Sequence, residues 1–212
     1  MISPHTITKD PTDLVTLVNE RDEVIGTMDK IEAHRGEAKL HRCVSVYLFQ
    51  KNKTGVELLI QQRAAVKIVG ANQWANTICG NVRPTEDYEQ CAYRRLREEL
   101  GITKVEIKPI YKFVYNLPCN EQFSEWEMDQ VFFGWYDGEV IPNPNEAQDF
   151  SWVKWQELLE ASEKTNADEQ NFKTKKVELK NQIKTKHFTL TPWFVWMLGD
   201  KKLINLLNKD IY

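Results

Sequence analysis

The 212 residues suffice for one large domain or two small ones with a substantial buried core. Hydrophobic residues make up 42% of the chain and charged residues 28%, as in ordinary globular proteins, and no apolar run reaches the length of a membrane span. The net charge of −3 favours neither nucleic acid nor an anionic membrane as a partner.

Four cysteines without a C-x-x-C pair are typical of reduced thiols in the cytoplasm. The first fifteen residues lack the basic and apolar regions of a signal peptide. We therefore expect a cytoplasmic protein.

The N-terminal part of the chain predicts two β-hairpins. Residues 14–18 and 24–28 flank a turn-rich Asn-Glu-Arg-Asp sequence. Residues 44–50 and 56–62 are rich in β-branched and aromatic side chains and flank a Lys-Asn-Lys-Thr-Gly turn.

Between and after these hairpins lie residues that could bind ions. His34 and His41 are seven residues apart, which alone is weak evidence for a metal site because surface histidines are common. Arg63 and Lys67 follow the last hairpin strand. They are either two solvated cations or cations held near Cys79, where an anion could bind.

Residues 79–102 read CGNVRPTEDYEQCAYRRLREELGI and predict a cysteine-bearing loop followed by a charged helix. Thr85 is the expected N-cap, with Glu86 and Asp87 as acidic residues of the first turn. Gly101 stands where a residue with positive φ would end the helix.

Within this helix, two Arg-Glu pairs are four residues apart and therefore share a face: Arg94 with Glu98, and Arg95 with Glu99. Charged helices of this kind are usually solvated and held by ordinary ion pairs. The spacing of the whole segment argues against that interpretation here.

Further strands are predicted at residues 105–115, at 123–134 and, as the final strand, at 150–153. In the second of these, Glu125 and Glu127 are two residues apart, so both carboxylates point to the same face. A solvent-facing edge would explain them less well, because the surrounding run is aromatic and apolar.

The C-terminal part begins with a helix over residues 155–161 and continues with a polar, lysine-rich insertion at 163–187, which could be a helix, a flexible excursion or a lid. Thr191 and Pro192 then fit the N-cap and first position of an amphipathic helix. Its apolar stripe comprises Phe194, Met197, Leu198, Leu203, Leu206 and Leu207. Strands around a charged helix favour one α+β domain over residues 1–212.

The segment at 79–102 resembles the Nudix box, the loop–helix signature of enzymes that handle diphosphates with divalent metals. The matching positions are Gly80, Glu86, Arg94, Leu96, Glu98, Glu99, Gly101 and Ile102. One position differs, because Arg95 replaces a glutamate that binds metal in Nudix hydrolases. A cation there repels a metal cluster but suits a substrate diphosphate. The difference is typical of type I isopentenyl-diphosphate Delta-isomerases.

This resemblance implies a Nudix fold of mixed β-sheets flanked by helices, and an isomerase that interconverts isopentenyl and dimethylallyl diphosphate by a 1,3-allylic proton shift. It implies one divalent ion, Mg²⁺ or Mn²⁺, at His34, His41, Glu125 and Glu127. It implies a second Mg²⁺, carried with the diphosphate, at Glu99.

The resemblance also implies a role for each remaining site residue. Cys79 and Glu127 would be the opposing acid/base groups, with Tyr115 as a hydrogen-bonding neighbour and Trp193 as the aromatic face for a carbocation. The diphosphate-binding cations would be Lys30, Arg63, Lys67 and Arg95. The partner is then a small molecule, with no nucleic acid or membrane.

Two features depart from the family pattern. Asn81 replaces a third histidine, so the metal would have two histidines, two glutamates and at most an amide oxygen, a set that favours harder ions and weaker binding. The insertion at 163–187 is longer than the family needs. Two alternatives therefore stay open: a Nudix diphosphohydrolase with a metal at Glu86, Glu98 and Glu99, or a catalytically weakened prenyl-diphosphate-binding relative.

Overall fold

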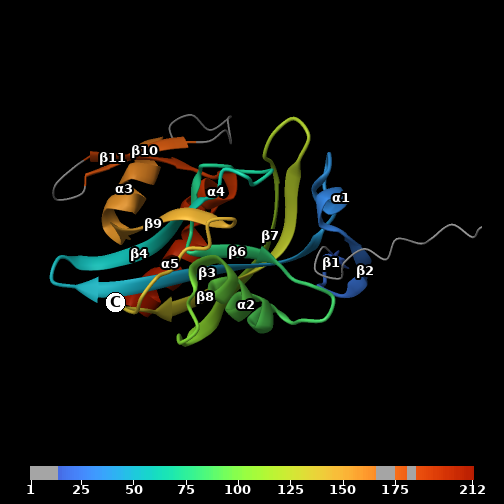
Figure 1. The fold of residues 1–212 in the computed structure, drawn as a ribbon, viewed down its shortest axis with the longest axis horizontal. Helices are drawn as coiled ribbons and strands as arrows, with labels where there is room; N and C mark the ends of the chain where they lie inside the picture. The colour runs from blue at the N-terminus through green and yellow to red at the C-terminus, as the bar shows by residue number, and fades with distance from the viewer. Residues whose placement is uncertain (1–13, 166–174, 181–184) are drawn as a thin grey trace, which may run out of the picture.

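The computed structural model describes residues 14–165, 175–180 and 185–212. The first fifteen residues, in which we expect no signal peptide, lie largely outside this part. Eleven strands in the described part form one sheet, in the order β10-β11-β5-β4-β3-β1-β2 along its main path (Figure 1). Strands β6 and β8 also pair with β3, β7 pairs with β8, and β9 pairs with β4. Strand β3 is thus the centre of the architecture.

Both predicted N-terminal hairpins are confirmed. Their strands are β1 (Leu14–Val18), β2 (Val24–Asp29), β3 (His41–Asn52) and β4 (Gly55–Arg63). The short helix α1 (Lys30–His34) follows β2, and the Asp29 side chain caps it by accepting a hydrogen bond from the Glu32 backbone N–H. Helix α1 thereby carries His34 toward the start of β3.

Cys79 lies in a strand, so the expected loop at this position is wrong. Two short strands, β5 (Trp74–Ala75) and β6 (Ile78–Asn81), follow β4. Strand β6 runs antiparallel to β3, with Cys79 directly opposite Ser45. The cysteine is therefore fixed by a backbone ladder at the middle of the sheet.

The charged helix is confirmed as α2 (Tyr88–Leu100), but its N-cap is Asp87 rather than Thr85. The Asp87 carboxylate accepts from the Gln90 backbone N–H, and the Gln90 side chain accepts from the Asp87 N–H. This capping box outcompetes a threonine cap. Glu86 therefore lies before the helix, where its carboxylate bonds Arg94. Gly101 ends the helix with φ +68°, as expected.

The next elements lie close to their predicted positions, and the strand predicted at 150–153 is longer at both ends. They are β7 (Ile107–Pro118), β8 (Ser124–Trp135), β9 (Ala147–Lys154) and α3 (Trp155–Thr165). Strand β8 pairs in parallel with β3 and places His41 directly opposite Glu127. This pairing joins residues 86 positions apart in the sequence and sets the centre of the functional site.

The polar insertion at 163–187 is neither wholly helical nor structureless in its described part. Residues 163–165 end α3, and two antiparallel strands follow, β10 (Lys175–Lys180) and β11 (Thr185–Leu190). Strand β11 joins the main sheet in parallel with β5 through Leu190 and Trp74. The strand at 150–153 is therefore not the last one.

The predicted C-terminal helix is two helices, α4 (Pro192–Gly199) and α5 (Lys201–Ile211). Thr191 has N-cap backbone geometry, but its side chain makes no capping hydrogen bond. The break occurs because the Asp200 carboxylate accepts from the backbone N–H groups of Lys202 and Leu203 and so starts a new helix.

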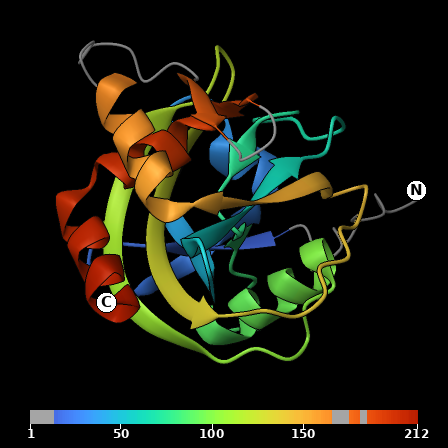
Figure 2. The ribbon, with the colours of Figure 1, turned by 90° about the vertical axis from the view of Figure 1, so that its left-hand side faces the viewer.

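Helices cover both faces of the sheet because side chains alternate along its strands. Tyr47 and Phe49 of β3 pack with α3, α4 and α5, whereas Val46 and Leu48 pack with α2. Figure 2 shows α2 on one side of the strands and α3 and α5 on the other. The predicted α+β class is confirmed. Within the described ranges, no helix has the length and apolarity that crossing a membrane requires.

Candidate functional site

One cavity of about 380 Å³ gathers most of the predicted site residues. This volume suits a small organic ligand. The predicted residues that line it are Lys30, His34, Arg63, Lys67, Cys79, Asn81, Arg95, Tyr115, Glu125, Glu127 and Trp193. His41 and Glu99 lie behind this wall, fully or almost fully buried.

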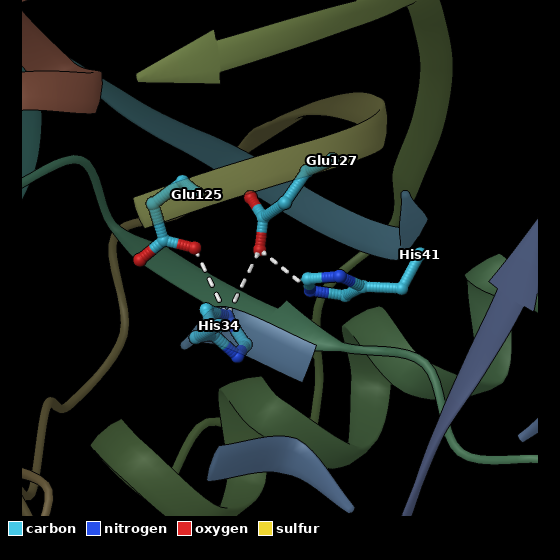
Figure 3. Close-up of side chains that lie close together, drawn as sticks. All are labelled: His34, His41, Glu125 and Glu127. Carbon is cyan, nitrogen blue, oxygen red and sulfur yellow. Dashed lines mark ion pairs between the residues drawn. The ribbon is translucent and has the colours of Figure 1, made fainter. Parts of the chain in front are cut away.

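His34, His41, Glu125 and Glu127 form a compact cluster, and their ligand atoms lie within 4.8 Å of one another (Figure 3). His34 Nε2 is 3.0 Å from Glu125 Oε2 and 4.0 Å from Glu127 Oε1. His41 Nε2 is 3.4 Å from the same Glu127 oxygen. Helix α1 and strands β3 and β8 supply the four side chains, which confirms that Glu125 and Glu127 share a face.

Both imidazole rings are oriented by backbone carbonyl groups. His34 Nδ1 lies 2.6 Å from the Lys30 carbonyl oxygen, and His41 Nδ1 lies 2.7 Å from that of Lys39. Since a carbonyl only accepts, each Nδ1 must carry the proton, and in a neutral ring the lone pair of Nε2 faces the carboxylates. The buried His41 Nε2 has no hydrogen-bond partner among the described residues. Two nitrogens and two carboxylates aimed at one point fit a divalent cation.

The electrostatics of the cluster show the same need for positive charge. Burial lowers the pKa of His34, but Glu125 and Glu127 more than offset this and raise it to about 9. Burial and the Glu127 charge raise the pKa of Glu125. Burial also disfavours the charged Glu127, yet His41, His34 and Tyr115 hold its pKa at about 2. Without a metal, a proton on His34 therefore supplies the positive charge.

Tyr115 is the direct neighbour of Glu127, as predicted. Its hydroxyl donates a short hydrogen bond to Glu127 Oε2, and both residues are buried. The Tyr115 ring stacks on Trp196 of α4 with centroids 5.6 Å apart. The phenol is thus held in place from its apolar side, and its hydroxyl is aimed at the carboxylate.

Cys79 is surrounded by groups that favour its protonated form. Its Sγ donates to Asn76 Oδ1 at 3.0 Å and lies 3.5 Å from Ser45 Oγ. Asn76 Nδ2 donates to the carbonyls of Val46 and Ile78, so its oxygen must face the sulfur. Burial, with the nearby Asp129, raises the pKa of the Cys79 thiol well above its ordinary value. The residue is therefore a neutral proton donor at the cavity wall.

The four predicted cations line the cavity, and three have described partners. Arg63 donates to the Val69 carbonyl and lies 5.0 Å from the centroid of the Trp193 ring. Lys67 and Arg95 both contact Glu146. Arg83 and Arg94, which were not predicted as ligands, line the same space. This group makes one part of the wall strongly cationic.

The carboxylates of Glu86 and of helix α2 are paired with arginines. Glu86 lies 2.5 Å from Arg94, and Glu98 contacts both Arg94 and Arg95. Glu99 lies 2.7 Å from Arg95 and also accepts from Gln61 Nε2. In the described part of the chain, the one His, Cys, Asp and Glu group suited to a metal is the His34 cluster.

Sequence reasoning missed two buried or partly buried acids. Asp129 is fully buried, accepts from Ser45 Oγ at 2.7 Å, and has its pKa raised to about 8 by burial and by Glu127. The period of two that selected Glu125 and Glu127 extends to it and could have found it. Glu146 follows a turn far along the chain, and no local pattern indicates that it reaches Lys67 and Arg95.

Comparison with protein families matches residues 39–175 to the NUDIX domain. Among curated proteins, the isopentenyl-diphosphate Delta-isomerase 1 of Aromatoleum aromaticum is 44% identical over 141 residues, which cover 66% of this chain and 77% of that protein. The isopentenyl-diphosphate Delta-isomerase of Aliivibrio fischeri is 38% identical over 162 residues, covering 74% of this chain and 88% of the relative.

Solved structures share the fold. A Deinococcus radiodurans protein, DR0079, aligns with a TM-score of 0.57 and 26% identity, covering 72% of this chain and 90% of that one. The M. smegmatis Nudix hydrolase RenU aligns with a TM-score of 0.51 and 14% identity, covering 90% and 93% respectively. The predicted mixed sheet flanked by helices is thus a Nudix fold.

Proposed function

This chain belongs to the Nudix family and, within it, to the isopentenyl-diphosphate Delta-isomerases, and from that premise we propose that it interconverts isopentenyl diphosphate and dimethylallyl diphosphate by a metal-dependent 1,3-allylic proton shift. The observation that carries this proposal is the shared cavity. A thiol, a carboxylate bonded to a phenol, an indole and several cations all line it.

The reaction requires a proton to be added to an unactivated alkene and another to be removed from C2. Cys79 and Glu127 are the proposed acid/base groups, because both face the cavity and come from different strands. Tyr115 positions the Glu127 carboxylate through its hydroxyl. A divalent ion bound at the cluster would supply positive charge that tunes the proton affinity of Glu127.

Between the two proton transfers the substrate carries a tertiary carbocation or something close to it. Trp193 is buried and lines the cavity, so its indole face can stabilise that charge by about 0.5–2 kcal/mol. The buried wall keeps water from the cation, which would otherwise be captured as an alcohol.

The proposed diphosphate site is the cationic wall of Lys30, Arg63, Lys67 and Arg95. Guanidinium and ammonium groups suit phosphate oxygens. We assign Mg²⁺ or Mn²⁺ to His34, His41, Glu125 and Glu127, with the Asn81 amide as a further candidate ligand. Glu99 is the proposed contact of a second Mg²⁺ that would enter with the diphosphate, and its carboxylate would then be shared between this ion and Arg95.

The diphosphohydrolase alternative is less well supported. It needs a metal on the segment at 79–102 to activate water. The three carboxylates available there, Glu86, Glu98 and Glu99, are each within 3 Å of an arginine nitrogen. A metal there would have to compete with an arginine for every one of these carboxylates.

A direct assay tests the proposal. Purified protein with isopentenyl diphosphate and Mg²⁺ or Mn²⁺ should form the dimethylallyl isomer without releasing phosphate. Proton NMR measures the formation of this isomer. Release of phosphate would favour the hydrolase, and tight binding without either product would favour the weakened relative.

The Cys79→Ala variant should lose isomerisation by at least about 10³-fold, because the thiol is one of two proton-transfer groups. Its unfolding transition should resemble that of the wild type. Cys119→Ala is the matched control, because Cys119 is a half-buried free thiol that is absent from the cavity lining. A normal rate in Cys79→Ala would remove the thiol from the mechanism.

A further inference from the structure

Glu146 is held rigidly beside the cationic wall. Its backbone N–H donates to the Asn143 carbonyl, and its own carbonyl accepts from the Ala64 N–H. Asn143 in turn donates to the carbonyls of Glu98 and Glu99 at the end of α2, through its side chain and its backbone N–H respectively. The turn before β9 is therefore tied both to the box helix and to the chain that follows β4.

From this position the Glu146 carboxylate bridges two cations with one oxygen. Its Oε2 accepts from Lys67 Nζ at 2.6 Å and from Arg95 Nη2 at 2.7 Å. Burial disfavours the charged form, but Arg95 and Lys67 outweigh it and hold the pKa of Glu146 at about 2. The carboxylate is therefore ionised at any working pH.

A phosphate oxygen would seek the same place. It is an anionic acceptor of the same kind as a carboxylate oxygen, and it bonds Lys and Arg at similar distances. Lys67, Arg95 and Glu146 all line the cavity. An incoming diphosphate would meet a negative charge already seated between two of its expected ligands.

We propose that Glu146 is a built-in competitor of the diphosphate: its carboxylate occupies, between Lys67 and Arg95, the position that a phosphate oxygen of the substrate takes, and so it sets the affinity of this end of the site. This inference rests on the proposed function, because it takes these two cations as diphosphate ligands. The competition weakens the hold on substrate and product alike.

The test is the binding of inorganic diphosphate, measured by isothermal titration calorimetry in EDTA so that no divalent ion takes part. Glu146→Gln keeps the length and an acceptor oxygen but removes the charge. The variant should bind diphosphate about tenfold more tightly than the wild type, because a like charge a few ångströms from the anion is gone. Cooperative unfolding of each variant is recorded first.

Two further variants make the comparison specific. Glu157→Gln is the matched control, since it also removes a carboxylate from an ion pair, with Lys154 at 3.1 Å, but lies on α3 outside the cavity lining. It should leave the affinity unchanged. In a Lys67→Met background the gain from Glu146→Gln should be smaller, because one of the two released cations is missing.

Weaker or unchanged binding in Glu146→Gln would overturn the inference and assign Glu146 to holding the cations in place. Equal tightening in Glu157→Gln would reduce the effect to bulk charge and also overturn it, as would undetectable binding in every variant. Because no turnover is needed, the two proposals fail separately. The affinity for diphosphate can change as expected in a protein that does not isomerise, and a protein that isomerises can show no such change.

Discussion

Asn81 is the residue at which this site differs most from the pattern that its sequence resembles. It ends β6, lines the cavity and pairs with Cys43 of β3, two residues beyond His41. It therefore stands next to the histidine and carboxylate cluster on a neighbouring strand. An amide oxygen is a weaker ligand than an imidazole for Mn²⁺.

Asn81→His should therefore tighten Mn²⁺ binding by about tenfold, as measured by calorimetric titration of the metal-free protein. Asn145→His is a suitable control, because Asn145 also lines the cavity but lies beside Glu146 at the cationic wall and not in the metal cluster. An unchanged titration in Asn81→His would mean that position 81 contributes nothing to metal binding.

Tyr115 offers a second test at the residue scale. Tyr115→Phe keeps the ring that stacks on Trp196 and removes the hydroxyl that bonds Glu127. We expect kcat to fall by about 10²-fold with little change in KM, because the phenol acts on the proton-transfer group rather than on the diphosphate. Tyr111→Phe, on the same strand, is the control. A rise in KM with an unchanged kcat would contradict this assignment.

At the scale of the elements, the first hairpin is tied to the rest of the fold through Asp22. This turn residue has φ +64° and accepts from Arg42 of β3, Lys112 of β7 and Tyr88 of α2. One carboxylate thus holds together four elements that are distant in sequence. The hairpin leads directly into α1 and His34.

Asp22→Asn should lower the free energy of unfolding by about 1.5–3 kcal/mol, the usual range for hydrogen bonds to a charged group. Asparagine tolerates the positive φ, so the backbone is spared. Urea unfolding against the exposed neighbour variant Glu20→Gln measures the effect. A difference no larger than that of the control would show that Asp22 does not anchor the hairpin.

The same carboxylate predicts a pH dependence. Burial disfavours its charge, but Lys112, Arg42 and Tyr88 outweigh this and hold the pKa of Asp22 below its ordinary value of 3.8. A lowered folded-state pKa means that the stabilisation is complete above that ordinary value and is lost as pH falls through the lower one. The difference between wild type and Asp22→Asn should be constant from neutral pH to about pH 5 and should shrink below pH 4.

The elements also show why some features could be predicted and others could not. Turn residues located both hairpins, start and stop signals located helix α2, and the period of two located the shared face of Glu125 and Glu127. The position of Asp87 as the cap depended on a competition between neighbouring caps. The break at Asp200 likewise replaced one long helix by two, because a single carboxylate could cap a new start.

Across the whole molecule, the candidate metal cluster joins parts that have little else in common. His34 comes from α1, His41 from the first residue of β3, and Glu125 and Glu127 from β8. The parallel pairing of β3 and β8 cannot be read from periodicity, because it is a choice among strands far apart in sequence. The resemblance to a known family, rather than local pattern, supplied this part of the site.

Metal removal should therefore destabilise the whole fold. An ion present at one hundred times its Kd stabilises the native state by about 2.7 kcal/mol, which for a chain of this size corresponds to a Tm shift of about 5–10 °C. Thermal unfolding with Mn²⁺ and with EDTA measures this shift. Glu125→Gln should largely abolish it. Equal Tm values in the wild type would show that the cluster binds no metal under those conditions.

Gly80 lies between the proposed proton donor Cys79 and the cation Arg95, and all three residues line the cavity. A Cβ built there would lie 2.5 Å from Arg95 Cγ, so the arginine stem crosses directly over the backbone next to Cys79. A substitution at position 80 would therefore displace the Arg95 side chain from the anion first, whereas the Cys79 sulfur would stay in its strand. A larger residue here would therefore weaken the hold on the substrate through one of the four proposed diphosphate-binding cations, and the proton donor would remain.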